Sequence, residues 1–509
     1  MLQIHWYVLA IIVFLLVIFK PFFIQKQEIY KSLPPSPPSL PIIGHLHLLK
    51  QPVHRTLQSL SQKYGEILLL RCGARNILLV TSPAAVEECF TKNDIVFANR
   101  PRLLAGKHFT YNYKTVIVAP YGDLWRNLRR VMTLEVLSPA RLAPSSNIRQ
   151  DQVRSLVSQL MQSYASGARK VELKSKFTDL SFNVMTMIIA GKRYFGDDFE
   201  DVEEAKQFRD VIRGTLDLSG VSNIGDFLPF LEWIDFQGYE KKMRGLMIKM
   251  DKFLQKLVEE HRQVLLIGNK ESDSDGSAKK TVVDNLLMMQ EKDPEFYTDE
   301  IIKGIMLVFL IAGSETSSST MEWAMALLLN HPDVLKKARA EIDANVGLGC
   351  MLDEQNLPKL NYLHNIINEA LRLYPPVPLL LPHEASNDCK VHGYDVPHGT
   401  MLMINAWAIQ RDPELWVEPT RFIPERFEGW NGEGYKLLPF GGGRRGCPGV
   451  AMANRVIGLA LGALIQSFEW ERVGGEEIDM VEGLGLTMPK VKPLEAIYRP
   501  RIVITEHPL

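Results

Sequence analysis

The sequence predicts a mainly α-helical fold with a minor β region, built around one long central helix. Three observations support this prediction. Apolar residues recur with helical period over most of the chain between residues 84 and 467. Strand-like stretches are short and lie at residues 66–82 and 388–404. Residues 301–329 form an apolar stretch which, as a helix, would be about 45 Å long, enough to cross a large core.

Each predicted element rests on a local pattern. Residues 66–82 contain two apolar runs separated by Gly73, which predicts a pair of short strands. Pro375 and Pro376 end the helix before them, because proline cannot continue a helix. Residues 270–280 are polar and rich in Gly, Ser and Asp, which predicts an exposed loop. The predicted helices cover residues 84–92, 122–137, 146–166, 176–191, 239–265, 299–329, 332–345, 361–373 and 449–467.

Length and composition favour one large globular unit. The chain has 509 residues and is 46% hydrophobic, which is ample for a sizeable core. No convincing linker follows residue 50, so we expect a single unit where length alone suggests three domains. The net charge of -1 argues against nucleic acid as a partner. Five cysteines without Cys-x-x-Cys spacing fit a reducing compartment better than a disulfide framework.

The N-terminus predicts a membrane anchor. Residues 6–19 are uniformly apolar, and the flanking residues nearly supply the roughly 20 needed to span a bilayer. Lys20, Lys26 and Lys31 follow this run and no cation precedes it, which places the globular body in the cytosol. A cleaved signal peptide would need a basic start and a small-residue cleavage site, and both are missing. We expect a signal-anchor helix at residues 1–25, a basic and Pro-rich hinge at 26–50, and the globular body at 51–509.

The most informative motif surrounds Cys447. This cysteine lies in a glycine-rich run, residues 440–449, that also contains Arg444 and Arg445. Glycines allow the backbone to approach a bulky ligand, and a thiolate is a soft axial ligand for haem iron. Arginines suit the carboxylate arms of such a ligand. The alternative is that Cys447 is a small buried apolar residue, which is the commoner role of a lone cysteine.

Two other interpretations of this run are weaker. Gly441, Gly443 and Gly446 formally match a dinucleotide-binding fingerprint. However, Pro439 precedes the motif, and only about sixty residues follow, too few for the second half of a nucleotide-binding fold. A zinc site would need further Cys or His residues at ligand spacing, and none lies near Cys447 in the sequence.

The middle of the long apolar helix is unusually polar. Residues 312–317 read Ala-Gly-Ser-Glu-Thr-Ser, and the Thr316 hydroxyl can bond back to the Ala312 carbonyl four residues earlier. Glu315 and Thr316 place an acid beside a hydroxyl, a pair that could deliver protons to a buried ligand. The alternative is a polar patch satisfied within the core.

Two further patterns pair charges or aromatics on one helix face. Glu369 and Arg372 are three residues apart, and their apolar flanks favour partial burial over an ordinary surface pair. A buried pair needs more partners, and Arg426 is a candidate. Trp125 and Arg129 are one turn apart and could hold an anionic ligand, although a solvated basic face would look similar.

These motifs together resemble the signature set of the cytochrome P-450 superfamily, the haem-thiolate monooxygenases. The Cys447 run meets the pattern F-x-x-G-x-R-x-C-x-G in full, and residues 424–427 read P-E-R-F. The Pro-rich hinge and the complete P-E-R-F resemble plant microsomal members of specialised metabolism. The other matches are E-x-x-R at Glu369 and Arg372, A-G-x-[DE]-T at Ala312, Gly313, Glu315 and Thr316, and W-x-x-x-R at Trp125 and Arg129.

The resemblance implies a cytochrome P-450-type fold with haem b as cofactor. Cys447 would be the axial ligand of the iron, and the thiolate would favour O–O cleavage. Thr316 and Glu315 would be the catalytic residues, guiding protons to the oxygen to be activated. The cofactor-binding residues that it implies are Trp125, Arg129, His383, Phe440, Arg445, Cys447 and Gly449.

The resemblance also implies a support for the haem loop and a substrate pocket. Glu369, Arg372 and Arg426 would form a structural triad. The pocket would hold a mostly hydrophobic, partly oxygenated molecule. It would be lined by residues 100–120, 309–313, 377–381 and 483–488.

The implied activity is an NADPH- and O2-dependent hydroxylation of a hydrophobic plant specialised metabolite, such as a flavonoid, isoflavonoid, lignan, indolic compound or terpenoid. The chain has no flavin- or nicotinamide-binding fingerprint, so electrons would come from a membrane-bound NADPH–cytochrome P-450 reductase. Cytochrome b5 is a second candidate partner, and membrane lipid a third. Arg126, Arg130 and Arg444 are candidates for the docking face.

The implied location is the endoplasmic reticulum membrane, single-pass, with the catalytic domain at 51–509 facing the cytosol. Two alternatives stay open. A haem-thiolate isomerase or dehydratase would act on hydroperoxides without a reductase; it needs no proton relay, so Glu315 and Thr316 argue against it. A haem-binding carrier or sensor would form no oxygen-dependent product.

Overall fold

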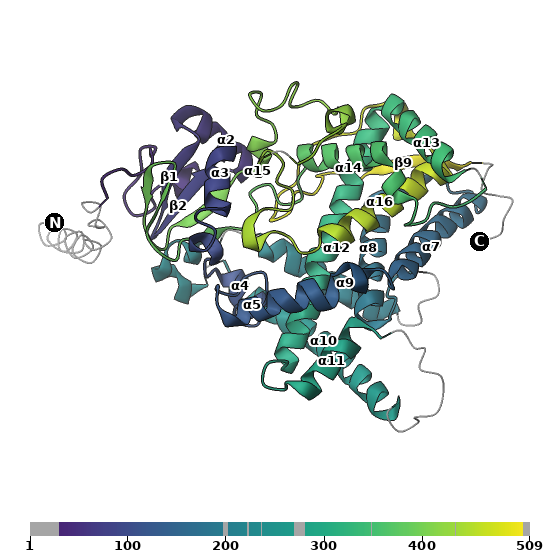
Figure 1. Cartoon of the computed structure of the whole chain (residues 1–509), viewed down its shortest axis with the longest axis horizontal. Helices are drawn as coiled ribbons and strands as arrows, with labels where there is room; N and C mark the ends of the chain where they lie inside the picture. The colour runs from purple at the N-terminus through teal and green to yellow at the C-terminus, as the bar shows by residue number, and fades with distance from the viewer. Residues whose placement is uncertain are drawn as a thin grey trace, which may run out of the picture.

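The structure is a computed structural model that describes residues 30–501, apart from 197–201, 221–222, 236, 269–279, 348 and 433 (Figure 1). The predicted anchor at 1–25 lies outside the described residues, and so do residues 26–29 of the hinge. The exposed loop expected at 270–280 lies outside them except for Lys280.

The long helix α12 (Asp299–Asn330) runs through the middle of the helical part of the molecule, as the sequence predicts (Figure 1). Thr298 caps its N-terminus by accepting a hydrogen bond from the Ile301 N–H. Its apolar residues are buried on nearly all sides, against α8 (Leu173–Ala190) and α16 (Val450–Ser467) above all. Such a helix can stay regular because surrounding helices bury every face of it.

The described part of the chain is mainly helical. The helices predicted from apolar periodicity occur within a few residues of their expected bounds, and α14 (Asn361–Leu373) has the predicted bounds. The helix expected at 122–137 is α-helical only over Asp123–Arg130 and continues as a π-helix over Val131–Val136. The other α-helices are α2 (Val53–Tyr64), α3 (Pro83–Phe90), α4 (Leu104–Phe109), α5 (Asp123–Arg130), α6 (Pro139–Leu142), α7 (Ser146–Ala165), α9 (Val202–Ser219), α10 (Tyr239–Gly268), α11 (Val282–Lys292), α13 (Pro332–Val346) and α15 (Ala406–Ile409).

The β region contains a four-stranded sheet in the order β1-β2-β7-β4. Side chains alternate between its two faces: Leu78 and Val80 face one hydrophobic cluster, while Ile77 and Leu79 face another. Figure 1 shows this sheet beside α2 and α3, at one end of the molecule. Its strands are β1 (Ile67–Cys72), β2 (Arg75–Val80), β4 (His383–Glu384) and β7 (Met401–Ile404).

Two smaller β units complete the described fold. β3 (Lys170–Glu172), β9 (Glu495–Pro500) and β8 (Phe468–Arg472) form a three-stranded antiparallel sheet, and β5 (Cys389–Val391) pairs with β6 (Tyr394–Val396). In the four-stranded sheet, β4 pairs antiparallel with β7, and this pairing fixes His383 opposite Leu402. The sheet therefore fixes the backbone of His383 in its edge strand β4.

Two of the described helices, α12 and α16, are long and apolar enough to span a membrane by length and composition. In both, 72% of the apolar window is buried inside the protein. We therefore interpret these two helices as core helices.

Candidate active site

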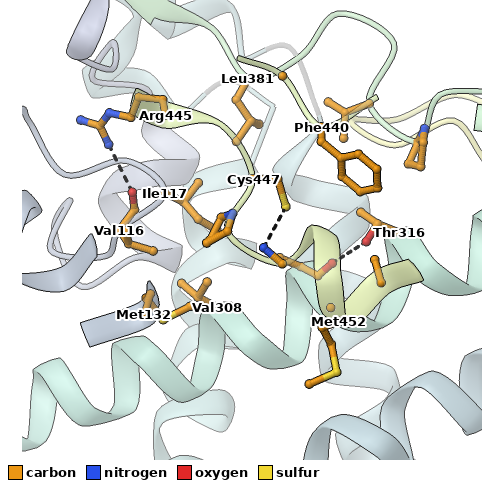
Figure 2. A pocket seen from close by; sticks show the side chains of 18 of the residues that line it. Val116, Ile117, Met132, Val308, Thr316, Leu381, Phe440, Arg445, Cys447 and Met452 are labelled. Carbon is orange, nitrogen blue, oxygen red and sulfur yellow. Dashed lines mark hydrogen bonds between the residues drawn. The ribbon is translucent and has the colours of Figure 1, made fainter. Parts of the chain in front are cut away.

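The functional motifs meet at an internal cavity. It provides about 270 Å³ and is bordered by α12, by the residues around Cys447 and by the segment from Pro376 to His383. Figure 2 shows Cys447 and Phe440 on one side of the cavity and Val308 and Thr316 on α12. Arginine and histidine side chains line it, but none of the described lining residues is Asp or Glu.

The loop before α16 holds Cys447 through its backbone. The Cys447 N–H donates to the Phe440 carbonyl at 2.9 Å, and the Gly449 N–H donates to Cys447 Sγ at 3.3 Å (Figure 2). Gly443 has φ of +61°, and a Cβ at this position would lie 2.5 Å from Asp94 Oδ1. A side chain at 443 would be strained by the left-handed backbone and would displace the Asp94 carboxylate, so glycine is favoured there.

The surroundings of Cys447 affect the pKa of its thiol in opposite directions. Burial raises its pKa, whereas the Gly449 N–H and the positive charge of Arg129 lower it. The sulfur is nevertheless accessible, because it faces the cavity. Of the described cysteines, Cys447 alone lines this cavity.

Three predicted cofactor-binding residues converge on one side of the cavity. Arg445 donates to the carbonyls of Ala98 at 2.7 Å and Ala119 at 2.6 Å, and its guanidinium lies 4.3 Å from the centre of the Trp125 ring. Arg129 donates to the Gly446 carbonyl at 2.7 Å. Burial lowers the pKa of Arg445 to about 9 and also lowers that of Arg129.

His383 and one unpredicted residue, Arg100, add to this positive region. His383 Nδ1 is 2.7 Å from the Phe97 carbonyl, and burial, with Arg100 and Arg445 nearby, lowers the pKa of its imidazole well below the usual value. Arg100 donates to the Leu381 carbonyl at 2.6 Å, and burial lowers its pKa to about 9. The sequence assigned Arg100 only to the substrate loop, since burial alone distinguishes it from the exposed Arg102.

The donor set of the cavity fits haem. Buried guanidinium groups are costly unless a charge of opposite sign is near, and here their protein partners are neutral carbonyls. A ligand that carries carboxylates would supply the missing negative charge. Cys447 offers the thiolate that iron accepts, and the remaining lining is mostly apolar.

Thr316 and Glu315 point to different surroundings. Thr316 lines the cavity, and its hydroxyl donates to the Ala312 carbonyl at 2.6 Å, which confirms the predicted backbone bond (Figure 2). Glu315 is not among the lining residues; its carboxylate accepts a hydrogen bond from Lys174 on α8 at 3.1 Å. The joint role of the two residues in proton delivery stays a prediction.

The structure brings Glu369, Arg372 and Arg426 together. The Glu369 carboxylate accepts bonds from Arg372 at 2.6 and 2.8 Å and from Arg426 at 2.9 Å. Glu369 and Arg372 are fully buried, and Arg372 also donates to the carbonyls of Gln410 and Pro419. This cluster has the additional partners that a buried ion pair requires.

The three arginines expected at a docking face differ in exposure. Arg444 is partly buried and donates hydrogen bonds to the Asp94 carboxylate at 2.7 Å and to the Tyr121 hydroxyl at 2.7 Å. Arg126 and Arg130 are exposed, and Arg126 pairs with Asp123. Two of the three therefore present a cation to solvent.

Comparisons with known proteins identify a family that this chain resembles over most of its length. The family described as Cytochrome P450 matches residues 34–494. Cytochrome P450 81Q32 of Catharanthus roseus is 54% identical over 98% of this chain and 97% of its own length. The (+)-piperitol/(+)-sesamin synthase CYP81Q2 of Sesamum radiatum is 50% identical over 94% of this chain and 93% of its own length. An isoflavone 2'-hydroxylase of Glycyrrhiza echinata is 48% identical over 94% of this chain and 94% of its own length. A zebrafish cytochrome P450 solved with progesterone has a TM-score of 0.75 and 25% identity, covering 89% of this chain and all of that one.

Proposed function

Because the chain belongs to the cytochrome P450 family of haem-thiolate monooxygenases, we propose that it hydroxylates an apolar plant specialised metabolite at the cavity beside Cys447. Haem is the cofactor of this family, and NADPH supplies its electrons through a reductase. When bound, haem supplies the chemistry of O2 activation and substrate oxidation. The residues of this chain would hold the cofactor, orient the substrate, exclude water and transfer protons.

Cys447 is the residue that we assign as the iron ligand. It is the one described cysteine on the cavity wall, and this observation carries the proposal. Burial raises the pKa of the Cys447 thiol, and the bond from the Gly449 N–H and the charge of Arg129 partly offset that rise; bonding to iron would then stabilise the thiolate. Phe440 also lines the cavity, and its carbonyl accepts the hydrogen bond from the Cys447 N–H.

Three buried arginines and the neutral His383 would hold the carboxylate arms of haem. Arg129, Arg445, the newly identified Arg100 and His383 all line the cavity. Their bonds to backbone carbonyls fix the side chains before a ligand arrives, so little conformational entropy is lost on binding. Trp125 contributes by stacking on Arg445 and by donating to the Val116 carbonyl at 3.1 Å.

Thr316 would hold a proton at the substrate side of the cavity. Its hydroxyl already bonds the Ala312 carbonyl, which orients the oxygen so that a lone pair can accept a second bond. Glu315, on the adjacent face of α12, would resupply the proton from the side where it contacts Lys174. In this scheme Thr316 acts directly and Glu315 acts through solvent.

The substrate class follows from the lining and from the relatives. Much of the cavity lining is apolar and includes Val308, Phe309, Val377 and Leu381. Relatives are named as an isoflavone 2'-hydroxylase and as a (+)-piperitol/(+)-sesamin synthase. A flavonoid, isoflavonoid or lignan is therefore the first choice, followed by indolic compounds and terpenoids of similar size.

For cellular context, we propose a single-pass protein of the endoplasmic reticulum membrane, anchored by residues 1–25, with residues 51–509 in the cytosol. NADPH–cytochrome P-450 reductase is the proposed electron donor, and cytochrome b5 is a second partner. Arg126 and Arg130 are the exposed cations proposed to face an acidic reductase surface.

The proposal is tested with microsomes that contain the full chain and a plant reductase. A panel of isoflavones, flavones and lignans is supplied with NADPH under air, and products are read by mass spectrometry. We expect a product one oxygen heavier that disappears without NADPH, reductase or O2. A product formed from a fatty-acid hydroperoxide in the absence of all three would instead support an isomerase or dehydratase.

A further inference from the structure

The end of α3 and the turn after it pack directly against the loop that carries Cys447. A Cβ added at Gly442 would lie 2.7 Å from Cδ2 of Phe90. A Cβ added at Gly443 would lie 2.5 Å from Oδ1 of Asp94. Neither glycine could carry a side chain unless its neighbour moved, so Phe90 and Asp94 set the position of this part of the loop.

Asp94 bonds one residue of the loop twice. Its Oδ1 accepts a hydrogen bond from the Arg444 backbone N–H at 3.0 Å, and its Oδ2 accepts one from the Arg444 Nε at 2.7 Å. Among the described residues, Asp94 is the one acidic residue that bonds any part of the segment 440–449. A single carboxylate therefore fixes both the backbone and the side chain of Arg444.

The position of Arg444 is transmitted to Cys447 through a short bonded turn. Arg444 lies in the 3-10 helix η9 (Gly443–Arg445), two residues before Cys447 begins the next segment of the loop. The Gly446 N–H closes this turn by donating to the Gly443 carbonyl at 3.0 Å. Because the turn is bonded internally, a carboxylate that holds Arg444 also limits the positions that Cys447 can adopt.

Asp94 also balances charge in the loop. Arg445 donates to the backbone carbonyls of Ala98, Val116 and Ala119, which carry no net charge. Arg444, in contrast, forms an ion pair with Asp94, and the two side chains are only 28% and 18% exposed. Solvent therefore screens this pair incompletely, and the loss of either partner would leave an unbalanced charge close to Cys447.

A second contact keeps the Arg444 guanidinium in place independently of Asp94. It donates to the Tyr121 hydroxyl at 2.7 Å and lies 5.0 Å from the centre of the Tyr121 ring. The Tyr121 ring lies 5.5 Å from the Trp125 ring, and Trp125 is one of the cavity-lining residues. Without the Asp94 carboxylate, the positive charge of Arg444 would thus remain beside the haem-binding residues.

We propose that Asp94 is a positioning residue for the haem-thiolate centre, which holds Arg444, cancels its charge and so keeps the reduction potential of the iron low. A positive charge near the iron favours the reduced form and raises the potential, whereas a negative charge lowers it. The intact ion pair adds little net charge. This inference rests on the proposed function, because that function makes Cys447 the iron ligand.

The test measures the reduction potential of the full-length, haem-loaded protein by dye-mediated titration at low ionic strength, where charges are least screened. Asp94→Asn keeps an oxygen that can accept from the Arg444 N–H but leaves the guanidinium unpaired, so the potential should shift upward. Arg444→Met leaves the Asp94 carboxylate unpaired, so the potential should shift downward. The double variant Asp94→Asn/Arg444→Met lacks both charges and should return close to the wild-type potential.

A merely mechanical role of the pair predicts a different pattern. Both single variants would then shift in the same direction and the double variant at least as far, and this result, or no shift in either single variant, would overturn the inference. Glu87→Gln, which changes an exposed carboxylate on α3, is the matched control and should keep the wild-type potential.

Haem retention and the carbonyl spectrum cover the remaining outcomes. If Asp94→Asn does not retain haem, recovery of haem binding in the double variant would support the charge argument, and failure to recover it would contradict the argument. A wild type that lacks a thiolate-type carbonyl spectrum would instead contradict the proposed function.

Discussion

Gln410, the residue that follows α15, accepts a hydrogen bond at Oε1 from the Leu438 N–H at 2.8 Å, just before the loop that carries Cys447. The amide nitrogen of Gln410 donates to the carbonyls of Leu371 and Arg372, at 3.1 and 2.8 Å. Gln410 is fully buried. One side chain therefore connects the Glu369 cluster to the proposed iron ligand.

We expect Gln410→Leu to weaken this connection. The substitution leaves the Leu438 N–H and two carbonyls without their partner, which should lower the free energy of unfolding by about 1–3 kcal/mol. The carbonyl spectrum of the reduced protein should convert more readily from the thiolate form on warming. Gln162→Leu, at an exposed helix position, is the control and should change stability by less than about 0.5 kcal/mol.

Glu369→Gln should be more damaging. It removes the carboxylate between two arginine side chains that are at most 10% exposed. Because their buried positive charge is then uncompensated, the free energy of unfolding should fall by roughly 3–5 kcal/mol. Urea unfolding at equal haem content measures the loss. Glu428→Gln removes a half-exposed carboxylate near Lys337 and serves as control. A loss below about 1 kcal/mol for Glu369→Gln would show that the triad does not support the fold.

Thr316→Ala should uncouple NADPH consumption from product formation. The hydroxyl on the cavity wall is lost, so product per NADPH should fall at least about tenfold while NADPH oxidation continues and hydrogen peroxide appears. Thr320→Ala is the control, since Thr320 also lines the cavity and its hydroxyl donates to the Thr316 carbonyl at 2.8 Å. Equal coupling in the wild type and Thr316→Ala would exclude Thr316 as the proton-holding residue.

Glu482 should make a pH-dependent contribution to stability. Bonds from His54 and Arg55 lower the pKa of its carboxyl from 4.5 to about 2, although burial opposes them. Because the folded-state pKa is depressed, the stabilisation is complete above about pH 4.5 and is lost as pH falls towards 2. At pH 7 the free energy of unfolding of Glu482→Gln should therefore be about 2 kcal/mol below that of the wild type. Urea unfolding at a series of pH values should show this difference becoming smaller below pH 4.5. Glu477→Gln, an exposed site, should show no such narrowing.

Much of the fold could be predicted because apolar periodicity is a local property. The bounds expected for α12 and α14 differ from those observed by one residue at most. The helix α2 was not predicted, although Val53, Leu57, Leu60 and Tyr64 follow helical spacing. The pairing of β3 with β9 joins segments distant in sequence, and no local pattern indicates such a partner.

The candidate site likewise contains residues that the sequence alone identifies and residues that only the structure identifies. Cys447, Thr316 and Arg445 belong to short motifs with fixed spacing, so the sequence was sufficient to single them out. Arg100 and Gln410 belong to none of the motifs that the sequence analysis used, and their importance depends on burial and on partners far away in the chain. Tertiary contacts of this kind can only be seen in a structure.

The most direct test of the central claim is the carbonyl spectrum of the reduced Cys447→Ser protein. A thiolate ligand gives bound carbon monoxide an unusually long-wavelength Soret band, so we expect this band in the wild type and in Cys350→Ser, which changes an exposed cysteine. In Cys447→Ser, haem should still be bound by the buried cations, but the long-wavelength band should be absent. Persistence of that band in Cys447→Ser would contradict the assignment of Cys447 as the iron ligand.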